Sequence, residues 1–128
     1  MRVIVLGGAG FMGSNFVRYL IKNYSDIEIL VYDKLTYAGR LENLHDVINN
    51  PRLTFVRGDV GNEELLEYVF KEFNPDIIVN FAAETHVDRS INEPSPFLRT
   101  NVIGVFTVLE VIRKLGIERY IHISTDEV

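Results

Sequence analysis

The sequence contains no cysteine, so disulfide bonds and thiolate metal sites are excluded. The three histidines, His45, His86 and His122, are scattered and do not indicate a metal centre. Basic residues form no stripe and the formal net charge is −5, so we expect no nucleic-acid partner. We find no apolar run long enough to span a bilayer, and the chain opens directly on a strand pattern with no room for a signal peptide. We therefore expect a cytoplasmic protein with no membrane partner and no bound metal.

The 128 residues are enough for one domain that buries roughly two-thirds of its unfolded surface. Apolar runs and helical periodicities alternate along the chain, which predicts an α/β fold with helices on both faces of a parallel sheet. Strands are predicted at 3–6, 28–32, 53–57, 77–81 and 120–123. Helical patterns follow the first strand, occupy 41–48 and 62–73, and extend from about 97 to 115 after an irregular loop at 82–96. The expected strand order is 3-2-1-4-5, the doubly wound (Rossmann) arrangement.

Three glycines follow the first predicted strand at the spacing G-x-x-G-x-x-G, and a helical pattern begins at once. Gly7 can make the tight turn, Gly10 lets a pyrophosphate approach the backbone, and Gly13 lets the helix lie close to the strand. The free N–H groups at the start of the helix then face the anion. The alternative is a tight strand-to-helix turn with no ligand, which also favours glycine.

Asp33 ends the second predicted strand, twenty positions after Gly13. A carboxylate at this place accepts hydrogen bonds from an adenosine ribose and repels a 2′-phosphate, which favours NAD over NADP. Lys34 and Arg40 follow closely and could weaken that preference. The alternative for Asp33 is a cap of a helix or turn.

Four stretches, at 7–13, 33–39, 82–91 and 124–128, together resemble the dTDP-glucose 4,6-dehydratases, which are extended short-chain dehydrogenases/reductases acting on nucleotide sugars. The glycine turn is common to that whole superfamily. The runs Lys-Leu-Thr-Tyr-Ala-Gly, Ala-Glu-Thr-His-Val-Asp-Arg-Ser and Thr-Asp-Glu are more specific. The resemblance extends from the first residue to the last. It implies a nucleotide-sugar substrate, with dTDP-glucose favoured, and a homodimer.

The resemblance also implies how NAD is held. Phe11 and Met12 offer main-chain N–H groups to the pyrophosphate, and Asp59 and Val60 border the adenine, although Asp59 could instead only stabilise its turn. The residues expected to line the adenosine ribose are Asp33, Lys34, Leu35 and Thr36. Those expected on the nicotinamide side are Phe81, Ala82, Ala83, Glu84, Thr85, Thr100 and Ser124, with Thr85 also near the sugar.

The family reaction is an internal redox elimination in which the sugar is oxidised at C4, loses its C5 proton and the C6 hydroxyl as water, and is reduced at C6. By resemblance, Asp126 is the acid for the leaving hydroxyl, Glu127 is the base at C5, and Thr125 binds the C4 oxygen of the substrate. Without the resemblance, an Asp-Glu pair after a strand is typical of a solvated helix cap.

The family's Tyr-x-x-x-Lys pair and its C-terminal substrate domain do not occur in these 128 residues. We therefore expect a truncated NAD-binding domain over 1–128, without dehydratase turnover of its own. Three alternatives remain open: a dehydratase of another nucleotide sugar, an epimerase, and a non-catalytic NAD-binding module. Phe106, Leu109 and Ile112 on the long helix could form core or a subunit interface.

Overall fold

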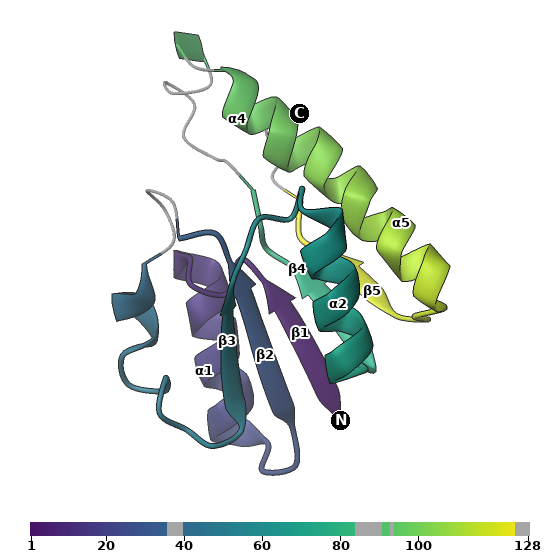
Figure 1. Ribbon diagram of the computed structural model, residues 1–128. Helices are drawn as coiled ribbons and strands as arrows, with labels where there is room; N and C mark the ends of the chain where they lie inside the picture. The colour runs from purple at the N-terminus through teal and green to yellow at the C-terminus, as the bar shows by residue number, and fades with distance from the viewer. Residues whose placement is uncertain (36–39, 84–90, 93, 125–128) are drawn as a thin grey trace.

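The computed structural model describes residues 1–35, 40–83, 91–92 and 94–124. Its centre is a parallel five-stranded sheet in the order β3-β2-β1-β4-β5, as the sequence predicts (Figure 1). The strands are β1 (Arg2–Leu6), β2 (Glu28–Asp33), β3 (Leu53–Arg57), β4 (Ile77–Asn80) and β5 (Tyr120–His122). In the register, Val5 of β1 pairs with Val31 of β2 on one side and with Val79 of β4 on the other.

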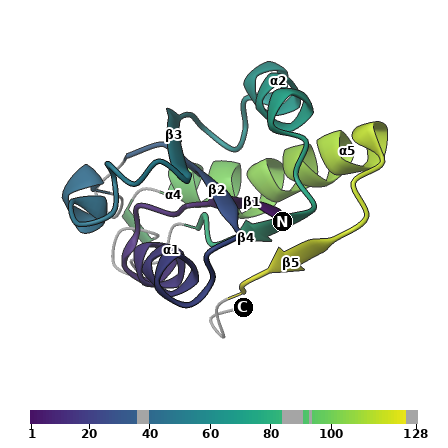
Figure 2. The same ribbon diagram turned by 90° about the horizontal axis from the view of Figure 1, so that it is seen from below.

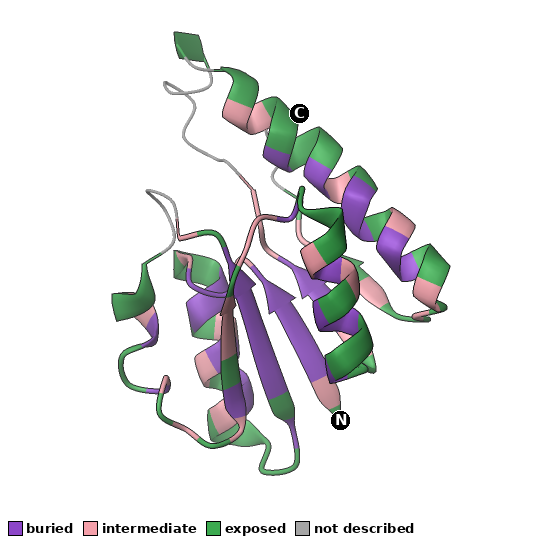
Figure 3. Ribbon diagram, in the orientation of Figure 1, coloured by how far each residue is buried: buried purple, intermediate pink, exposed green. Residues whose placement is uncertain are grey.

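Helices cover both faces of the sheet, which makes three layers (Figure 2). On one face lie α1 (Phe11–Asn23) and the short 3₁₀ helix η1 (Leu41–Leu44). On the other lie α2 (Glu63–Phe73) and α5 (Val105–Leu115). Side chains alternate along each strand, so Ile4 and Leu6 join the core under α2 and α5, whereas Val3 and Val5 join the core under α1. The central strands are therefore buried on both faces, which explains their unbroken apolar runs (Figure 3).

The predicted helix ends are confirmed at three positions. The Asn62 side chain accepts a hydrogen bond from the Leu65 N–H and caps α2. Asn74, with φ of 53°, ends α2 in the left-handed conformation just before Pro75. Gly116, with φ of 70°, ends α5 in the same way.

The long C-terminal helix begins earlier than the sequence predicts. Helix α4 (Pro94–Leu98) leads through a wider π-type segment, η2 (Arg99–Gly104), directly into α5. The polar, irregular sequence from 82 to 96 predicts a loop as far as Pro96. Pro94 and Pro96 occupy the first turn of the helix, where no intrahelical partner for their missing N–H is needed.

The continuous helix Pro94–Leu115 has 22 residues and, by length and composition alone, could cross a membrane. The expectation that no segment reaches that length is therefore wrong. The helix is long and apolar enough because apolar residues occupy two of its faces. Val108, Val111 and Ile112 are buried under α2 and the sheet, while Val102 and Phe106 are exposed on the outer face (Figure 3).

Candidate functional site

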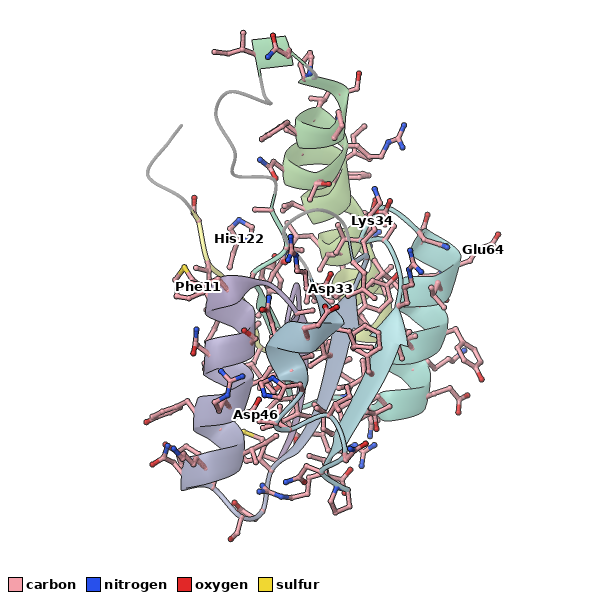
Figure 4. All side chains as sticks on the ribbon, turned by 90° about the vertical axis from the view of Figure 1, so that its left-hand side faces the viewer. Phe11, Asp33, Lys34, Asp46, Glu64 and His122 are labelled. Carbon is pink, nitrogen blue, oxygen red and sulfur yellow. The ribbon has the colours of Figure 1, made fainter. Side chains whose placement is uncertain are left out.

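The carboxyl ends of the parallel strands bring the sequence-predicted residues to one edge of the sheet. The strand order reverses between β1 and β4, so a crevice at this edge is where such sheets bind ligands. Phe11 at the start of α1, Asp33 and Lys34 at the end of β2, and His122 at the end of β5 all lie toward this edge, whereas Asp46 lies lower, beside α1 (Figure 4).

The glycine turn between β1 and α1 has the geometry that the sequence predicts. Gly7 has φ of +73°, and a Cβ on it would lie 2.7 Å from the Ala82 backbone nitrogen at the end of β4. A Cβ on Gly13 would collide with the Gly7 carbonyl oxygen, so the helix does lie against the strand end. Among the described residues, a Cβ on Gly10 would meet only the Gly7 oxygen, at 3.4 Å. Packing within the fold thus demands glycine at 7 and 13, and leaves Gly10 facing open space that a phosphate can use.

Helix α1 begins at this turn without a side-chain cap. Its N-cap is Gly10, and among the described residues no side chain hydrogen-bonds to the cap and no acidic residue stands in the first turn. The first N–H groups of a helix have no intrahelical partner, and the helix dipole adds positive potential there. The side chains of Phe11 and Met12 are exposed, which leaves their main-chain groups as the polar features of the helix start. This end of α1 is suited to an anion.

The Asp33 carboxylate is directed at the glycine turn, as a ribose-binding role requires. Oδ2 accepts a hydrogen bond from the Ala9 N–H at 2.9 Å, and Oδ1 accepts one from the Leu35 N–H at 2.7 Å. Asp33 is 8% exposed, and the second bond holds Leu35 at φ of 59°. Each carboxylate oxygen can accept a further hydrogen bond, so the group can bind ribose hydroxyls while it fixes the turn.

Asp59 follows β3 and faces Lys34, which follows β2. The Lys34 Nζ lies 3.3 Å from Asp59 Oδ2, and Asp59 Oδ1 accepts a hydrogen bond from the Gly61 N–H at 2.9 Å. The second bond shows that Asp59 does stabilise its own turn, as the alternative interpretation held. The Tyr32 hydroxyl donates to the Asp59 carbonyl, and burial together with the Asp59 charge raises the pKa of Tyr32. Val60 is buried beneath the turn, and contact of Asp59 and Val60 with adenine stays a prediction.

The end of β4 is held by a polar chain that the sequence analysis missed. Asn80 is 1% exposed, and its Oδ1 accepts from the Ala82 N–H while its Nδ2 donates to the Tyr120 hydroxyl at 3.0 Å. The Tyr120 oxygen lies 3.0 Å from His122 Nδ1, and burial raises the pKa of Tyr120. Because the bond between Asn80 and Tyr120 joins strands forty residues apart, no local pattern signals it. These hydrogen bonds fix Ala82, whose backbone lies against Gly7.

The remaining predicted residues divide into two groups. Thr100 is buried in η2 and Phe81 packs its ring against Phe16, with centroids 5.4 Å apart, while Ala83 is half-buried and Ser124 is exposed. The other predicted residues, Thr36, Glu84, Thr85, Thr125, Asp126 and Glu127, lie outside the described residues. Within the described ranges no group of three or more His, Cys, Asp or Glu side chains could hold a metal ion.

A doubly wound sheet with an uncapped glycine turn and an acidic residue at the end of its second strand defines a dinucleotide-binding protein. Residues 4–128 match the family described as GDP-mannose 4,6 dehydratase, and the chain belongs to that family. It is 51% identical over 128 residues to a dTDP-glucose 4,6-dehydratase of Mycobacterium tuberculosis, covering 100% of this chain and 37% of the relative. It is 50% identical to the low-salt glycan biosynthesis protein Agl12 of Haloferax volcanii, covering 100% of this chain and 40% of the relative.

Solved structures of two nucleotide-sugar enzymes also resemble this chain closely. The dTDP-glucose 4,6-dehydratase DesIV of Streptomyces venezuelae, solved with NAD, superposes with a TM-score of 0.93 at 48% identity and covers 100% of this chain and 40% of its own. The UDP-glucose 4-epimerase of Thermotoga maritima, solved with UDP-glucose, has a TM-score of 0.86 at 35% identity and covers 98% of this chain and 38% of its own. The chain thus spans well under half the length of these relatives.

Proposed function

We propose that this chain is the NAD-binding part of a nucleotide-sugar 4,6-dehydratase, a lyase, whose substrate is dTDP-glucose. The observation that carries the cofactor assignment is the hydrogen bond from the Ala9 N–H to Asp33 Oδ2. It joins the expected ribose-binding carboxylate to the expected phosphate-binding turn in one arrangement. The similarity to dTDP-glucose 4,6-dehydratases, some solved with NAD, supports the choice of cofactor and substrate.

In this proposal the chain's own groups divide the cofactor between them. The N–H groups of Phe11 and Met12, at the uncapped start of α1, bind the pyrophosphate. Asp33 binds the adenosine ribose and disfavours a 2′-phosphate by charge repulsion. The backbone at Ala82, fixed by Asn80 and packed against Gly7, forms the wall on the nicotinamide side. When bound, NAD supplies the oxidation at C4 of the sugar and the later reduction at C6.

The acid–base chemistry is assigned to the run Ser124–Val128, of which Thr125, Asp126 and Glu127 lie outside the described residues. Glu127 removes the C5 proton after oxidation at C4 has acidified it, and Asp126 gives a proton to the departing C6 hydroxyl. Thr125 donates a hydrogen bond to the C4 oxygen. Two adjacent carboxyl groups can serve as base and acid when their surroundings keep one ionised and the other protonated.

A second candidate is a nucleotide-sugar 4-epimerase, because the Thermotoga maritima UDP-glucose 4-epimerase also superposes closely. An epimerase inverts C4 and eliminates no water, so the two candidates give different products. The complete gene product is incubated with dTDP-glucose and, separately, with UDP-glucose, and the products are identified by mass and NMR. A 4-keto-6-deoxy product supports the dehydratase, and Glu127→Gln then abolishes it.

A sugar inverted at C4 without loss of water would show that the protein is an epimerase and not a dehydratase. NAD binding, measured by calorimetry, with neither product would indicate a non-catalytic binding module. The absence of NAD binding would contradict the whole proposal. Asp33→Ala is the companion variant, and we expect it to lower the affinity for NAD at least tenfold. The one carboxylate serves both the ribose and the Ala9 N–H, and each contact contributes about 1 kcal/mol or more.

We also propose that the protein is a homodimer formed through the outer face of α4, η2 and α5. Exposed apolar side chains recur there at helical spacing and form one stripe: Leu98, Val102, Ile103, Phe106 and Leu109. Contiguous apolar surface of this kind is typical of an interface. Arg99, Glu110, Arg113 and Lys114 on the same helix favour a protein partner in the cytoplasm over lipid as the cover of this face.

A further inference from the structure

Ala9, in the middle of the glycine turn, is fully buried and its peptide groups are held from outside the turn. Its N–H donates to Asp33 Oδ2. Its carbonyl oxygen accepts two hydrogen bonds, from the Arg40 N–H at 3.1 Å and from Asn43 Nδ2 at 2.8 Å. All three partners come from the segment that runs from Asp33, the last residue of β2, to Asn43 in η1. The two ends of that segment therefore converge on one residue of the turn.

Asn43 is the side chain that makes this contact, and it is itself held firmly. Its N–H donates to the Arg40 carbonyl at 3.0 Å, and its carbonyl accepts from Arg18 Nη2 of α1 at 2.7 Å. Arg18 also forms an ion pair with Asp46, at 2.6 Å between Nε and Oδ2. The main chain of Asn43 is thus fixed, in part by α1, the helix whose first turn faces the expected anion, and its carboxamide donates to Ala9 from this fixed main chain.

The Ala9–Gly10 peptide is planar, so the direction of its carbonyl sets the direction of the Gly10 N–H. While the Ala9 carbonyl accepts the hydrogen bond from Asn43, the Gly10 N–H donates to the Gly7 oxygen at 3.2 Å and closes the turn. The carbonyl oxygen then points away from the anion site, toward η1. If this peptide rotated, a carbonyl oxygen could face the site and repel a diphosphate.

We propose that Asn43 is a positioning residue for the cofactor diphosphate, acting through the Ala9 carbonyl. It keeps the Ala9–Gly10 peptide in the anion-accepting orientation and couples the ribose-binding segment to the turn. The inference rests on the proposed NAD-binding function. Nothing in local sequence patterns indicates it, because Asn43 lies 34 positions from Ala9.

The test uses the complete gene product with two probes, ADP, which carries the diphosphate, and adenosine, which does not. Asn43→Asp places a carboxylate oxygen against the Ala9 carbonyl, and Asn43→Ala removes the donor without adding charge. We expect ADP to bind about tenfold more weakly to Asn43→Asp and about fivefold more weakly to Asn43→Ala, while adenosine changes less than about twofold. Hydrogen exchange of the Gly10, Phe11 and Met12 amides rises in both variants.

The matched controls are Asn23→Asp and Asn23→Ala. Like Asn43, Asn23 donates from Nδ2 to a main-chain carbonyl. The acceptor is Tyr19, at 2.9 Å, and it lies near the C-terminal end of α1, far from the glycine turn. We expect these variants to bind ADP like the wild type. Equal weakening of ADP and adenosine, or no weakening of either, would overturn the positioning role. If Asn43→Asp does not fold, Asn43→Ala decides the matter alone. A wild type that binds neither ADP nor NAD would instead refute the proposed function.

Discussion

At the scale of single residues, the site depends on side chains that hydrogen-bond to main-chain groups. Asp33 reaches Ala9, Asn43 reaches the same residue, and Asn80 reaches Ala82. Each fixes main chain that borders the proposed cofactor site. The sequence analysis identified Asp33 by its distance from the glycines. It missed both asparagines, because an asparagine after a strand or in a connection is most often part of an ordinary turn.

Lys34 and Asp59 provide a residue-scale prediction about cofactor preference. Asp59 pairs with the Lys34 ammonium, which would otherwise be available to a 2′-phosphate. We expect Asp59→Asn to raise the NADP-to-NAD affinity ratio about threefold to fivefold, since a partly exposed ion pair is worth up to about 1 kcal/mol. Calorimetry with both dinucleotides measures the ratio, and Lys34→Met added to Asp59→Asn should return it to the wild-type value. An unchanged ratio in Asp59→Asn would contradict the prediction.

At the scale of elements, the pair Arg18–Asp46 joins α1 to the turn that follows η1, and Gly104 brings the end of η2 against Val60 in the β3–α2 turn. The helix and strand patterns predict that these elements exist and where they end. The patterns do not predict how they approach one another. That depends on contacts between residues distant in the sequence.

The Arg18–Asp46 pair leads to a prediction about pH. The hydrogen bond from Arg18 is the main reason that the pKa of Asp46 falls from its usual 3.8 to about 2. A lowered pKa in the folded state stabilises the fold above pH 3.8, and this contribution is lost as the pH falls through about 2. We expect the difference in urea midpoint between wild type and Asp46→Asn to be constant at neutral pH and to shrink in that acidic range. Asp26→Asn, another exposed carboxylate change, is the control, and a pH-independent difference would contradict the assignment.

Gly104 leads to a prediction about packing. A Cβ at this position would lie 2.5 Å from Cγ2 of Val60, so the end of η2 can approach the β3–α2 turn this closely only with glycine there. We expect Gly104→Ala to lower the free energy of unfolding by about 1 to 3 kcal/mol, despite the better helix propensity of alanine. Chemical denaturation measures the change. If the collision with Val60 is the cause, Val60→Ala should lower the free energy of unfolding less in the Gly104→Ala variant than in the wild type. Additive losses in the double variant would exclude the collision as the cause.

At the scale of the whole molecule, two of the exposed apolar surfaces among the described residues bear on association. One is the outer stripe on α4, η2 and α5 that we assign to a second copy of the chain. The other is the α1-side face of the edge strand β5, where Ile121 is exposed. Exposed apolar surface of this kind favours association with a partner.

The proposed dimer gives a whole-molecule prediction. Phe106 is 65% exposed at the centre of the outer stripe, and a carboxylate there would be buried without a partner on dimerisation. We expect Phe106→Glu to convert a dimer into a monomer, as measured by light scattering after gel filtration. Tyr68→Glu is the matched control, because Tyr68 is 64% exposed on α2, away from the stripe, and should leave the dimer intact. A wild-type monomer, or a Phe106→Glu dimer, would refute the interface.

The sequence by itself determined the strand order, the glycine turn, the Asp33 position and the family, because each depends on local periodicity or on short motifs at fixed spacing. Only the tertiary structure decided which groups fix the turn: Ala9 is held by Asp33, Arg40 and Asn43, and Gly7 by its contact with Ala82. The helical start at Pro94 was likewise decided by tertiary structure, since α4 continues through η2 into the packed helix α5. The physical reason is that hydrogen bonds and packing between segments distant in the chain leave no periodic trace in the sequence.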